Sequence, residues 1–332
     1  MQELLINSVQ ALEEAMPVIR AAQEEYATFT QEQVDAICEK AATAVSKMRI
    51  PLAKMAVEET GYGIMVDKVT KNQYASEHIW NYMRHAKTCG IIEENKAFGT
   101  KRIASPKGVI AAITPTTNPT STTIYKILLA LKTRNAIILS PHPRAVQCSI
   151  AAARIMRNAA IEAGMPPHVI SWIATPTLEI SPVLMQRVDF IMATGGAGMV
   201  NAAYSSGTPA VGVGPGNCNV VIDETADLRM AVESIIHSKT FDNGMICASE
   251  QHITVLASVY DEVKALLKDA RCYFLNDEQA EKVAGVFFNA KTHGVNPPAV
   301  GQTAVHLAEM AGFEVPYDTK VLIYETNDTS HD

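Results

Sequence analysis

The stretch that decides the fold is VIAAITPTTNPT, residues 109–120. It begins with an unbroken apolar run, Val109 to Ile113, and then turns polar before a helix-like segment from Thr120 to Leu131. A short continuous apolar run bounded by turn residues is typical of a strand that is buried on both faces. The succession of strand, loop and helix is the repeating unit of an α/β fold.

The same pattern recurs further along the chain. Helical patterns separate most of the later strand-like runs, which are Ala136 to Leu139, Val169 to Ile173, Phe190 to Ala193, Ala210 to Val213 and Val220 to Ile222. Continuous apolar strands that alternate with helices predict a parallel sheet covered on both faces. The expected fold class is therefore α/β, with a doubly wound nucleotide-binding architecture of the Rossmann type.

The first hundred residues are mainly helical in pattern. Thr30 followed by Gln33 is a capping-box signature, and apolar residues then recur at helical spacing. A second helix is expected to start at Pro51 and to stop near Gly61 and Gly63.

Length and composition limit the classes of protein. A chain of 332 residues exceeds one typical domain and predicts two. Apolar residues make up 48% and charged residues 19%, and no apolar run approaches the roughly 20 residues of a membrane span. Met1 to Ala22 reads as a polar amphipathic helix and not as a signal or transit peptide. We therefore expect no membrane association and a cytoplasmic location.

Charge and cysteine usage narrow the partners. The formal net charge of -7, without any cluster of Lys and Arg, disfavours nucleic acid. Anionic cofactors must then be held by backbone amides and helix ends. The cysteines have neither metal-ligand spacing nor the density of a disulfide framework, which predicts reduced thiols and no metal site. They are Cys38, Cys89, Cys148, Cys218, Cys247 and Cys272.

One cysteine stands apart, in the run FDNGMICASEQ at residues 241–251. Cys247 lies in a small polar turn before the strand-like stretch Ile253 to Leu256, and Gly244 allows the backbone to approach a substrate. A thiol in such a turn suits covalent capture of a carbonyl group. A small buried hydrophobe is the competing interpretation and the commoner fate of cysteine. Local composition leaves the two interpretations about equal.

Three loops are candidate ligand sites, because open α/β sheets bind ligands outside the carboxyl ends of their strands. The first, ITPTTN at residues 113–118, is by itself most simply a polar turn with a proline stop. The second and third, TGGAG at 194–198 and GVGPGN at 212–217, contain glycines that expose amides to a pyrophosphate. A glycine turn is often only a turn, so both interpretations remain open.

The segment around Cys247 resembles the catalytic-cysteine segment of the aldehyde dehydrogenase superfamily. Its form ICASEQ is similar to the CoA-acylating branch, and in particular to the aldehyde dehydrogenase half of bifunctional aldehyde-alcohol dehydrogenases. The likeness runs from about Glu25 to Glu325 and includes FTQEQVD at 29–35, IPLAKMA at 50–56 and PTTNPT at 115–120. The resemblance implies an aldehyde dehydrogenase-like fold, with a doubly wound Rossmann-type cofactor domain and an incomplete α/β catalytic domain.

The resemblance also sets the expected domains. Residues 1–240 should form an NAD-binding domain with a helical N-terminal region, and residues 241–332 a catalytic domain that is C-terminally incomplete. A polar strand-like stretch near 97–107 should form a hairpin that reaches a neighbouring subunit. The implied assembly is a homo-oligomer, which forms filaments when joined to an alcohol dehydrogenase domain.

Individual site roles follow from the resemblance. Cys247 matches the catalytic nucleophile, and Asn118 matches an asparagine whose side-chain amide donates to the substrate oxyanion, a contact commonly worth about 3 kcal/mol. Gly196 and Gly214 match cofactor contacts, and His142 matches a wall of the cofactor pocket with no catalytic role. The expected cofactor-binding residues are Ile113, Thr114, Pro115, Thr116, Thr117, Asn118, His142, Gly196 and Gly214.

Two departures from the wider superfamily refine the expected chemistry. Hydrolytic members carry a glutamate base where this chain has Gly212, so a thioester on Cys247 should persist until a thiol such as CoA attacks it. Most relatives carry lysine at the position of Ser140, and its loss favours NAD over NADP. We therefore expect an NAD-dependent oxidoreductase that interconverts acetaldehyde, or another short aldehyde, plus CoA and acetyl-CoA.

Two alternatives stay open at this point. One is a hydrolytic aldehyde or semialdehyde dehydrogenase, against which Gly212 argues. The other is a truncated, non-catalytic assembly module, because the family continues past the position of Asp332.

Overall fold

A computed structural model of the chain describes residues 3–289 and 294–327. Its contacts divide it into two compact units, one of Met1–Gly61 and Met65–Pro215, and one of Tyr62–Ile64 and Gly216–Asp332. Each unit has its own sheet structure and its own core. The functional boundary expected after residue 240 stays a prediction.

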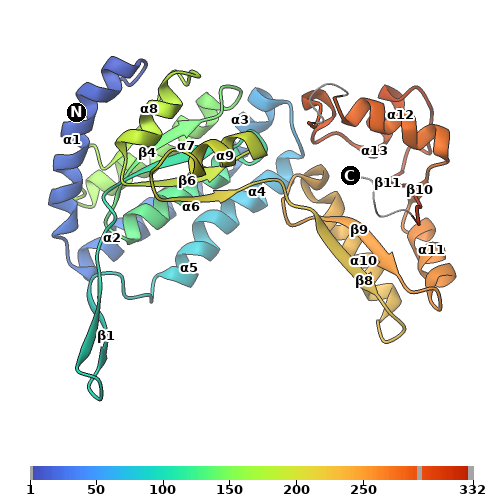
Figure 1. Cartoon of the computed structure of the whole chain (residues 1–332), viewed down its shortest axis with the longest axis horizontal. Helices are drawn as coiled ribbons and strands as arrows, with labels where there is room; N and C mark the ends of the chain where they lie inside the picture. Colours follow the sequence, from blue (N-terminus) through green and yellow to red (C-terminus); the bar gives the residue numbers. More distant parts are fainter. Residues whose placement is uncertain (1–2, 290–293, 328–332) are drawn as a thin grey trace. The chain divides into compact units, whose positions relative to one another are not determined.

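The first unit contains a five-stranded parallel sheet in the order β5-β4-β3-β6-β7 (Figure 1). The chain adds β4 and β5 on one side of β3 and then crosses to add β6 and β7 on the other side. This reversal beside β3 is the switch point of a doubly wound fold, so the predicted fold class is confirmed. The strands are β3 (Val109–Thr114), β4 (Ala136–Pro141), β5 (Ile170–Trp172), β6 (Phe190–Thr194) and β7 (Ala210–Val213).

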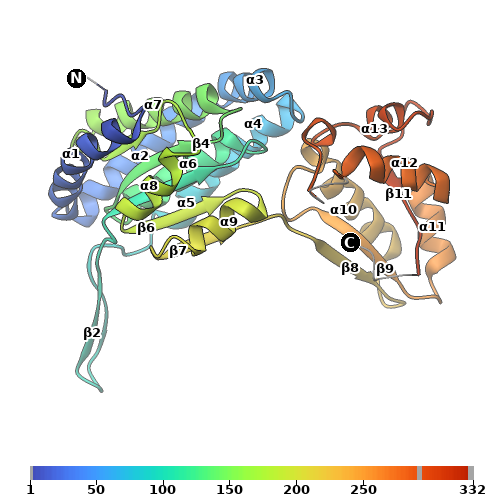
Figure 2. The same cartoon turned by 45° about the horizontal axis from the view of Figure 1, so that its top comes forward.

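Helices cover both faces of this sheet (Figure 2). β3 and β4 are buried at every position, and their side chains alternate between two cores because successive residues of a strand point to opposite faces. Ile110 and Ala112 join the core that contains α2, α6 and α7, whereas Val109 and Ala111 join the core that contains α1 and α8. The helices of this unit are α1 (Val9–Ala27), α2 (Gln31–Lys47), α3 (Arg49–Thr60), α4 (Met65–Gln73), the π-helix η1 (Tyr74–His78), α5 (Ile79–Met83), α6 (Pro119–Lys132), α7 (Val146–Glu162), α8 (Ile180–Arg187) and α9 (Ala197–Tyr204).

The predicted start and stop signals of the N-terminal helices are confirmed. The Thr30 side chain accepts from the Gln33 amide and the Gln33 side chain accepts from the Thr30 amide, which is the capping box at the start of α2. The next helix, α3, ends at Gly61, which adopts a left-handed conformation with φ of 71°. It begins two residues before Pro51, so the proline lies within its first turn.

The predicted pairing of one strand is wrong. Val220 to Ile222 belongs to a strand, β8 (Cys218–Ile222), but β8 pairs in parallel with β9 (Glu250–Val255) in the second unit and not with the five-stranded sheet. A parallel neighbour of β7 would need a crossover of about a dozen residues or more, and only residues 214–217 separate β7 from β8.

The second unit is built on two small parallel strand pairs, β8 with β9 and β10 with β11. Apolar side chains of β8, α10 and α11, among them Ile222, Ile235 and Leu267, form its core. Its other elements are α10 (Leu228–Thr240), the 3-10 turn η2 (Phe241–Gly244), α11 (Tyr260–Asp269), β10 (Cys272–Phe274), α12 (Asp277–Phe287), the 3-10 turn η3 (Pro297–Ala299), α13 (Ala304–Met310) and β11 (Val321–Ile323).

An antiparallel hairpin projects from the first unit (Figures 1 and 2). It consists of β1 (Gly90–Asn95) and β2 (Thr100–Ala104), so it begins earlier than the predicted stretch near 97–107, which covers its turn and its second strand. Ile91 and Ile103 pair across the hairpin and both are more than half exposed. The expected role of the hairpin in assembly stays a prediction.

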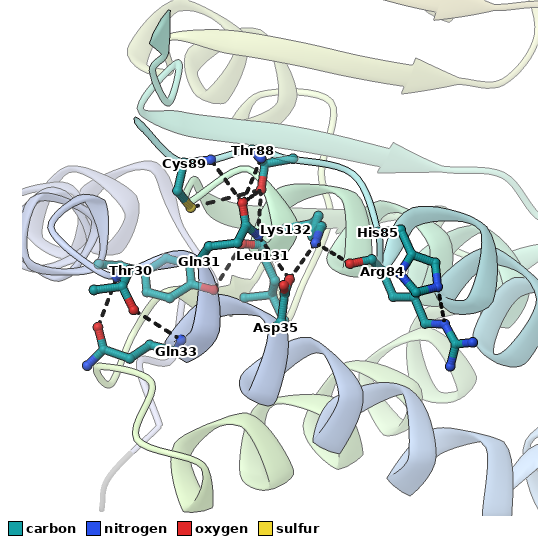
Figure 3. Close-up of polar contacts among 11 residues, drawn as sticks. Thr30, Gln31, Gln33, Asp35, Arg84, His85, Thr88, Cys89, Leu131 and Lys132 are labelled. Atoms are coloured by element: carbon teal, nitrogen blue, oxygen red, sulfur yellow. Dashed lines mark hydrogen bonds and ion pairs between the residues drawn. The ribbon is translucent and has the colours of Figure 1, made fainter. Parts of the chain in front are cut away.

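A buried ammonium group fixes the N-terminal helical layer to α6 (Figure 3). Lys132, at the end of α6, is 2% exposed, forms an ion pair with Asp35 of α2 and donates to the Arg84 carbonyl oxygen at 3.2 Å. Its nitrogen also lies 5.6 Å from the centre of the Trp80 ring. Near this pair, the Gln31 side-chain oxygen accepts from two backbone amides of the segment that leads to β1. The layer is thus held by a buried ammonium group that is paired with the Asp35 carboxylate.

Replacing Asp35 with alanine should lower the free energy of unfolding by about 3 kcal/mol, because Lys132 would remain buried without its counter-charge. Urea denaturation measures this change. Glu58→Ala is the matched control, since Glu58 pairs with Lys54 between side chains that are 64% and 66% exposed. That exposed pair should contribute less than about 1 kcal/mol. Equal losses in the two variants would contradict the role of the buried pair.

Candidate active site

The loops at the switch point of the sheet contain most of the predicted cofactor residues. Residues 115–118 connect β3 to α6, and Gly195 and Gly196 connect β6 to α9. β3 and β6 are adjacent parallel strands, so these two loops lie at the same edge of the sheet, where doubly wound folds bind ligands. His142 follows β4 and Gly214 follows β7 at this same edge. The structure therefore brings these predicted residues to one edge.

Unused hydrogen-bonding capacity at this edge fits a dinucleotide. Thr114 Oγ1 is buried and has no hydrogen-bond partner among the described residues. Gly196 begins α9 without any side-chain cap, and a Cβ atom there would meet nothing within 4 Å. The uncapped N-terminus of α9 suits a phosphate group of NAD.

Two lysines of α4 hold the loop after β3. Lys68 Nζ donates to the Thr117 carbonyl oxygen at 3.0 Å, and Lys71 Nζ donates to Asn118 Oδ1 at 2.6 Å. Because the amide oxygen accepts from Lys71, the nitrogen is the donor end of Asn118, and it reaches Thr117 Oγ1 at 3.1 Å. The sequence indicated neither lysine as a site residue. Lysines usually lie on the surface, and nothing in the sequence distinguishes one that is only 2% exposed, as Lys68 is.

A third lysine joins the two strands of the switch point. Lys126 of α6 is 4% exposed, and its Nζ donates to the carbonyl oxygens of Ile113 at 2.6 Å and Met192 at 2.8 Å. Burial lowers the pKa of Lys126 to about 7. The amine is therefore charged in only part of the molecules near neutral pH. The sequence contained no signal for this contact, because it lies inside an apolar helix face.

His142 accepts a backbone hydrogen bond. Its Nδ1 accepts from the Arg144 amide at 3.1 Å. Burial and the neighbouring Arg144 lower the pKa of His142, so the ring is neutral at physiological pH. Its place in a cofactor pocket stays a prediction.

The position of the absent hydrolytic base is closely packed. A Cβ atom on Gly212 would lie 2.6 Å from Val200 Cγ1 and 3.0 Å from Tyr204 Cε2, both on α9. The Tyr204 hydroxyl also accepts from the Gly212 amide at 2.9 Å. A glutamate at this position would therefore require the Val200 and Tyr204 side chains to shift.

In the second unit, Cys247 follows a turn of left-handed backbone. Asp242, Asn243 and Gly244 have φ values of 50°, 52° and 72°. The left-handed region is unfavourable for residues with a side chain, so Asp242 and Asn243 must be held there by their surroundings. Cys247 itself is exposed. The structure thus presents the thiol to solvent, which the interpretation as a buried hydrophobe did not expect.

The start of β8 lies against the backbone of Cys247. A Cβ atom on Gly216 would overlap the Cys247 carbonyl oxygen and lie 2.8 Å from the carbonyl carbon, so only glycine fits there. The Cys218 thiol donates to the same oxygen at 3.5 Å. Sequence reasoning singled out Gly214 and missed Gly216, although both glycines stand in the run GVGPGN.

Charged and polar groups surround the cysteine turn. Lys239 Nζ donates to Gln251 Oε1 at 2.7 Å, and burial lowers the pKa of Lys239 while Glu250 opposes this effect. Ser249 Oγ and Glu250 Oε2 are buried without hydrogen-bond partners in the described part of the chain. The turn therefore keeps buried polar atoms whose hydrogen-bonding capacity no described group satisfies.

Within residues 3–289 and 294–327, no group of three or more His, Cys, Asp or Glu side chains could hold a metal ion. No helix in those ranges is long and apolar enough to cross a membrane.

A doubly wound sheet with loops at its switch point is typical of nucleotide-binding proteins, and the second unit exposes the Cys247 thiol. The comparison with known sequences narrows this class. The chain belongs to the aldehyde dehydrogenase family, whose sequence profile matches residues 6–285.

Individual relatives are similar over nearly the whole chain. The bifunctional aldehyde-alcohol dehydrogenase of Escherichia coli K12 is 53% identical over 324 residues, which cover 97% of this chain and 36% of that protein. The chain thus spans about a third of the length of such relatives.

Two solved structures share the fold. An acetylating aldehyde dehydrogenase from Geobacillus thermoglucosidasius matches with a TM-score of 0.92 and 46% identity, over 96% of this chain and 71% of that chain. A propionaldehyde dehydrogenase from Rhodopseudomonas palustris, with bound CoA and an acylated cysteine, matches with a TM-score of 0.86 and 29% identity, over 100% of this chain and 75% of that chain.

Iodoacetamide at about pH 8 should label Cys247 more than about tenfold faster than Cys38 or Cys148, because the exposed thiolate is the reactive species. Burial raises the pKa of both comparison thiols well above the usual range, and it raises the pKa of Cys272 to about 11. Peptide mass mapping after a short exposure measures the order of labelling. A Cys247→Ser variant should lose the fast label. Faster labelling of Cys38 would contradict the assignment.

Proposed function

We propose that this protein is an NAD-dependent, CoA-acylating aldehyde dehydrogenase. It interconverts a short aldehyde such as acetaldehyde, CoA and NAD with the acyl-CoA and NADH. The observation that carries the proposal is Gly212, which stands where hydrolytic members have their base and which the Val200 and Tyr204 side chains of α9 closely surround. The names of similar proteins support it, since one is an acetylating aldehyde dehydrogenase and another was solved with CoA and an acylated cysteine.

In the oxidative direction the Cys247 thiolate attacks the carbonyl carbon of the aldehyde and forms a carbon–sulfur bond. The carbonyl oxygen gains the negative charge, and the Asn118 side-chain amide and the Cys247 backbone amide donate to it. Lys71 orients Asn118 for this role by occupying its oxygen. Bound NAD would supply the acceptor for the hydride that leaves the former aldehyde carbon. Cys247 is then left as a thioester.

The second half of the reaction needs a thiol and not an activated water. The CoA thiolate attacks the thioester carbon, the bond to Cys247 breaks and the cysteine leaves as a thiolate. Water attack is slow, because no glutamate stands at position 212 to remove its proton. The proposed preference for CoA over water therefore follows from the absence of a glutamate side chain at position 212.

The cofactor contacts proposed here are those of the switch-point edge. Residues 113–117 after β3, with Gly196, Gly214 and His142, would hold NAD. The absence of lysine at Ser140 removes a cation that a 2′-phosphate would use, which supports NAD over NADP.

We also propose an oligomeric state and a cellular location for the protein. The hairpin of β1 and β2 exposes Ile91, Phe98 and Ile103, and such exposed apolar side chains support its use as an oligomer contact. The protein would then be a homo-oligomer, and a filament where an alcohol dehydrogenase domain is attached. All six cysteines are free thiols, which supports a cytoplasmic setting.

With acetaldehyde and NAD but no CoA, the protein should form NADH for about one turnover per site and then stop, because the acyl-enzyme lacks a base-assisted route to water. Adding CoA should restore steady NADH formation and yield acetyl-CoA. Stopped-flow absorbance measures the NADH, and intact mass detects an acetyl group on Cys247 in the stalled enzyme. Steady acetate formation without CoA would instead support the hydrolytic alternative.

A direct test uses acetyl-CoA alone. Transfer of the acetyl group to Cys247 requires neither NAD nor hydride transfer, and its absence in a folded protein would support the non-catalytic module. The Cys247→Ser variant is the control for non-specific acetylation.

Replacing Asn118 with alanine should lower turnover by about a hundredfold, because one donor to the oxyanion is lost. NAD affinity, measured by calorimetry, should stay nearly unchanged. Asn158→Ala removes an exposed amide side chain on α7, outside the proposed site, and this control should keep turnover within about threefold. A loss confined to NAD binding would place Asn118 in the cofactor pocket alone.

A further inference from the structure

The left-handed turn before Cys247 rests on a buried carboxylate. Asp242 is 0% exposed, and its Oδ1 accepts from the Ile64 backbone amide at 2.7 Å. Ile64 belongs to a three-residue segment, Tyr62–Ile64, which lies in the second unit although α3 and α4 on either side of it lie in the first. A segment from the beginning of the chain is therefore in contact with the turn that carries the nucleophile.

Gly63 leaves the space that this carboxylate occupies. A Cβ atom on Gly63 would overlap Asp242 Oδ1 and the Met245 side chain, and would lie 2.8 Å from Asp242 Cγ. Gly63 also has a φ of 76°, so its backbone is already in the region that favours glycine. The absence of a side chain at this position lets the carboxylate reach the Ile64 amide.

Further contacts hold both partners in place. Tyr62 is buried and its hydroxyl donates to the Pro297 carbonyl oxygen at 2.7 Å. Asn243, the second left-handed residue, donates from Nδ2 to the Gly301 carbonyl oxygen at 2.8 Å. Met245 is buried, with its sulfur close to Gly301. The turn is thus fixed from two distant parts of the chain, on both sides of its strained residues.

We propose that Asp242 is a positioning residue for Cys247, and that Gly63 and the Ile64 amide hold the Asp242 carboxylate in place. This inference rests on the proposed function, in which Cys247 is the nucleophile. Asp242 does not touch the reacting atoms in this account. It acts by holding the left-handed turn from which residues 245–247 lead to the thiol.

The physical reason is the cost of the turn. Two residues with side chains occupy the left-handed region, at about 1 kcal/mol or more each, and an extended alternative is open to them if their contacts are lost. A hydrogen bond from a backbone amide to a carboxylate is among the stronger ones. A shift of the thiol by about 1 Å is enough to slow attack by about a hundredfold.

The first test compares two alanine substitutions with the same backbone strain. Gly63→Ala and Gly61→Ala both place a side chain at positive φ, at 76° and 71°, but a Cβ at Gly61 meets nothing within 4 Å. Gly63→Ala should slow acetyl transfer from acetyl-CoA to Cys247 by about thirtyfold or more, and Gly61→Ala by less than about threefold. Equal rates in the two variants would overturn the proposal.

The second test uses the carboxylate itself. Asp242→Asn keeps an oxygen that can accept from the Ile64 amide, whereas Asp242→Ala removes it. The asparagine variant should keep the acetyl-transfer rate within about fivefold, while the alanine variant should lose about a hundredfold with an unchanged half-saturation for acetyl-CoA. If Asp242 only stabilised the fold, the maximal rate would not be expected to fall with alanine and to be restored with asparagine. A wild-type rate in a folded Asp242→Ala protein refutes the assignment.

Iodoacetamide labelling of Cys247 separates failure of this inference from failure of the proposed function. Absence of acetyl transfer in the wild-type protein would count against the function, but the labelling rates of the Gly63→Ala and Gly61→Ala variants would still differ if Asp242 positions the thiol. Identical labelling rates in the wild type and in all four variants would overturn the positioning role even if acetyl transfer is present. Should Asp242→Ala fail to fold, the pair of glycine variants decides the question.

Discussion

The burial of β3 on both faces, between β4 and β6, is the constraint on which the first unit depends. A strand with a neighbour on each side satisfies its backbone through two ladders, and its alternating side chains must then enter two separate cores. Helices are therefore required on both faces. The order in which the chain adds its strands reverses beside β3, so the loops after β3 and β6 lie at the switch point, where doubly wound folds bind ligands.

Three lysine side chains hold the strands and the loop at the switch point. Lys126 joins the carbonyl groups of β3 and β6, and Lys68 and Lys71 hold the loop that follows β3. An amine has several donors, so it can connect carbonyl oxygens of separate segments of the chain. The orientation of the Asn118 amide thus depends on a helix that precedes it by more than forty residues in the chain.

The proposed reaction class depends on small residues as much as on reactive ones. At Gly212 the Val200 and Tyr204 side chains of α9 lie where a Cβ atom would stand. Gly216 leaves room for the carbonyl group of Cys247, and Gly63 leaves room for the Asp242 carboxylate. In the proposed reaction, the absence of these side chains affects how the thiol is presented and which nucleophile attacks its thioester.

The sequence by itself determined the alternation of strands and helices, the capping box at Thr30 and the glycine stop of α3, because each of these is a local pattern. Resemblance pointed to Cys247 and Asn118, whose roles stay predictions. Only the tertiary structure decided that β8 leaves the five-stranded sheet, that Lys71 meets Asn118 across 47 positions, and that Ile64 meets Asp242 across 178 positions. Such contacts have no periodicity along the chain, since they arise only when separate elements are packed together.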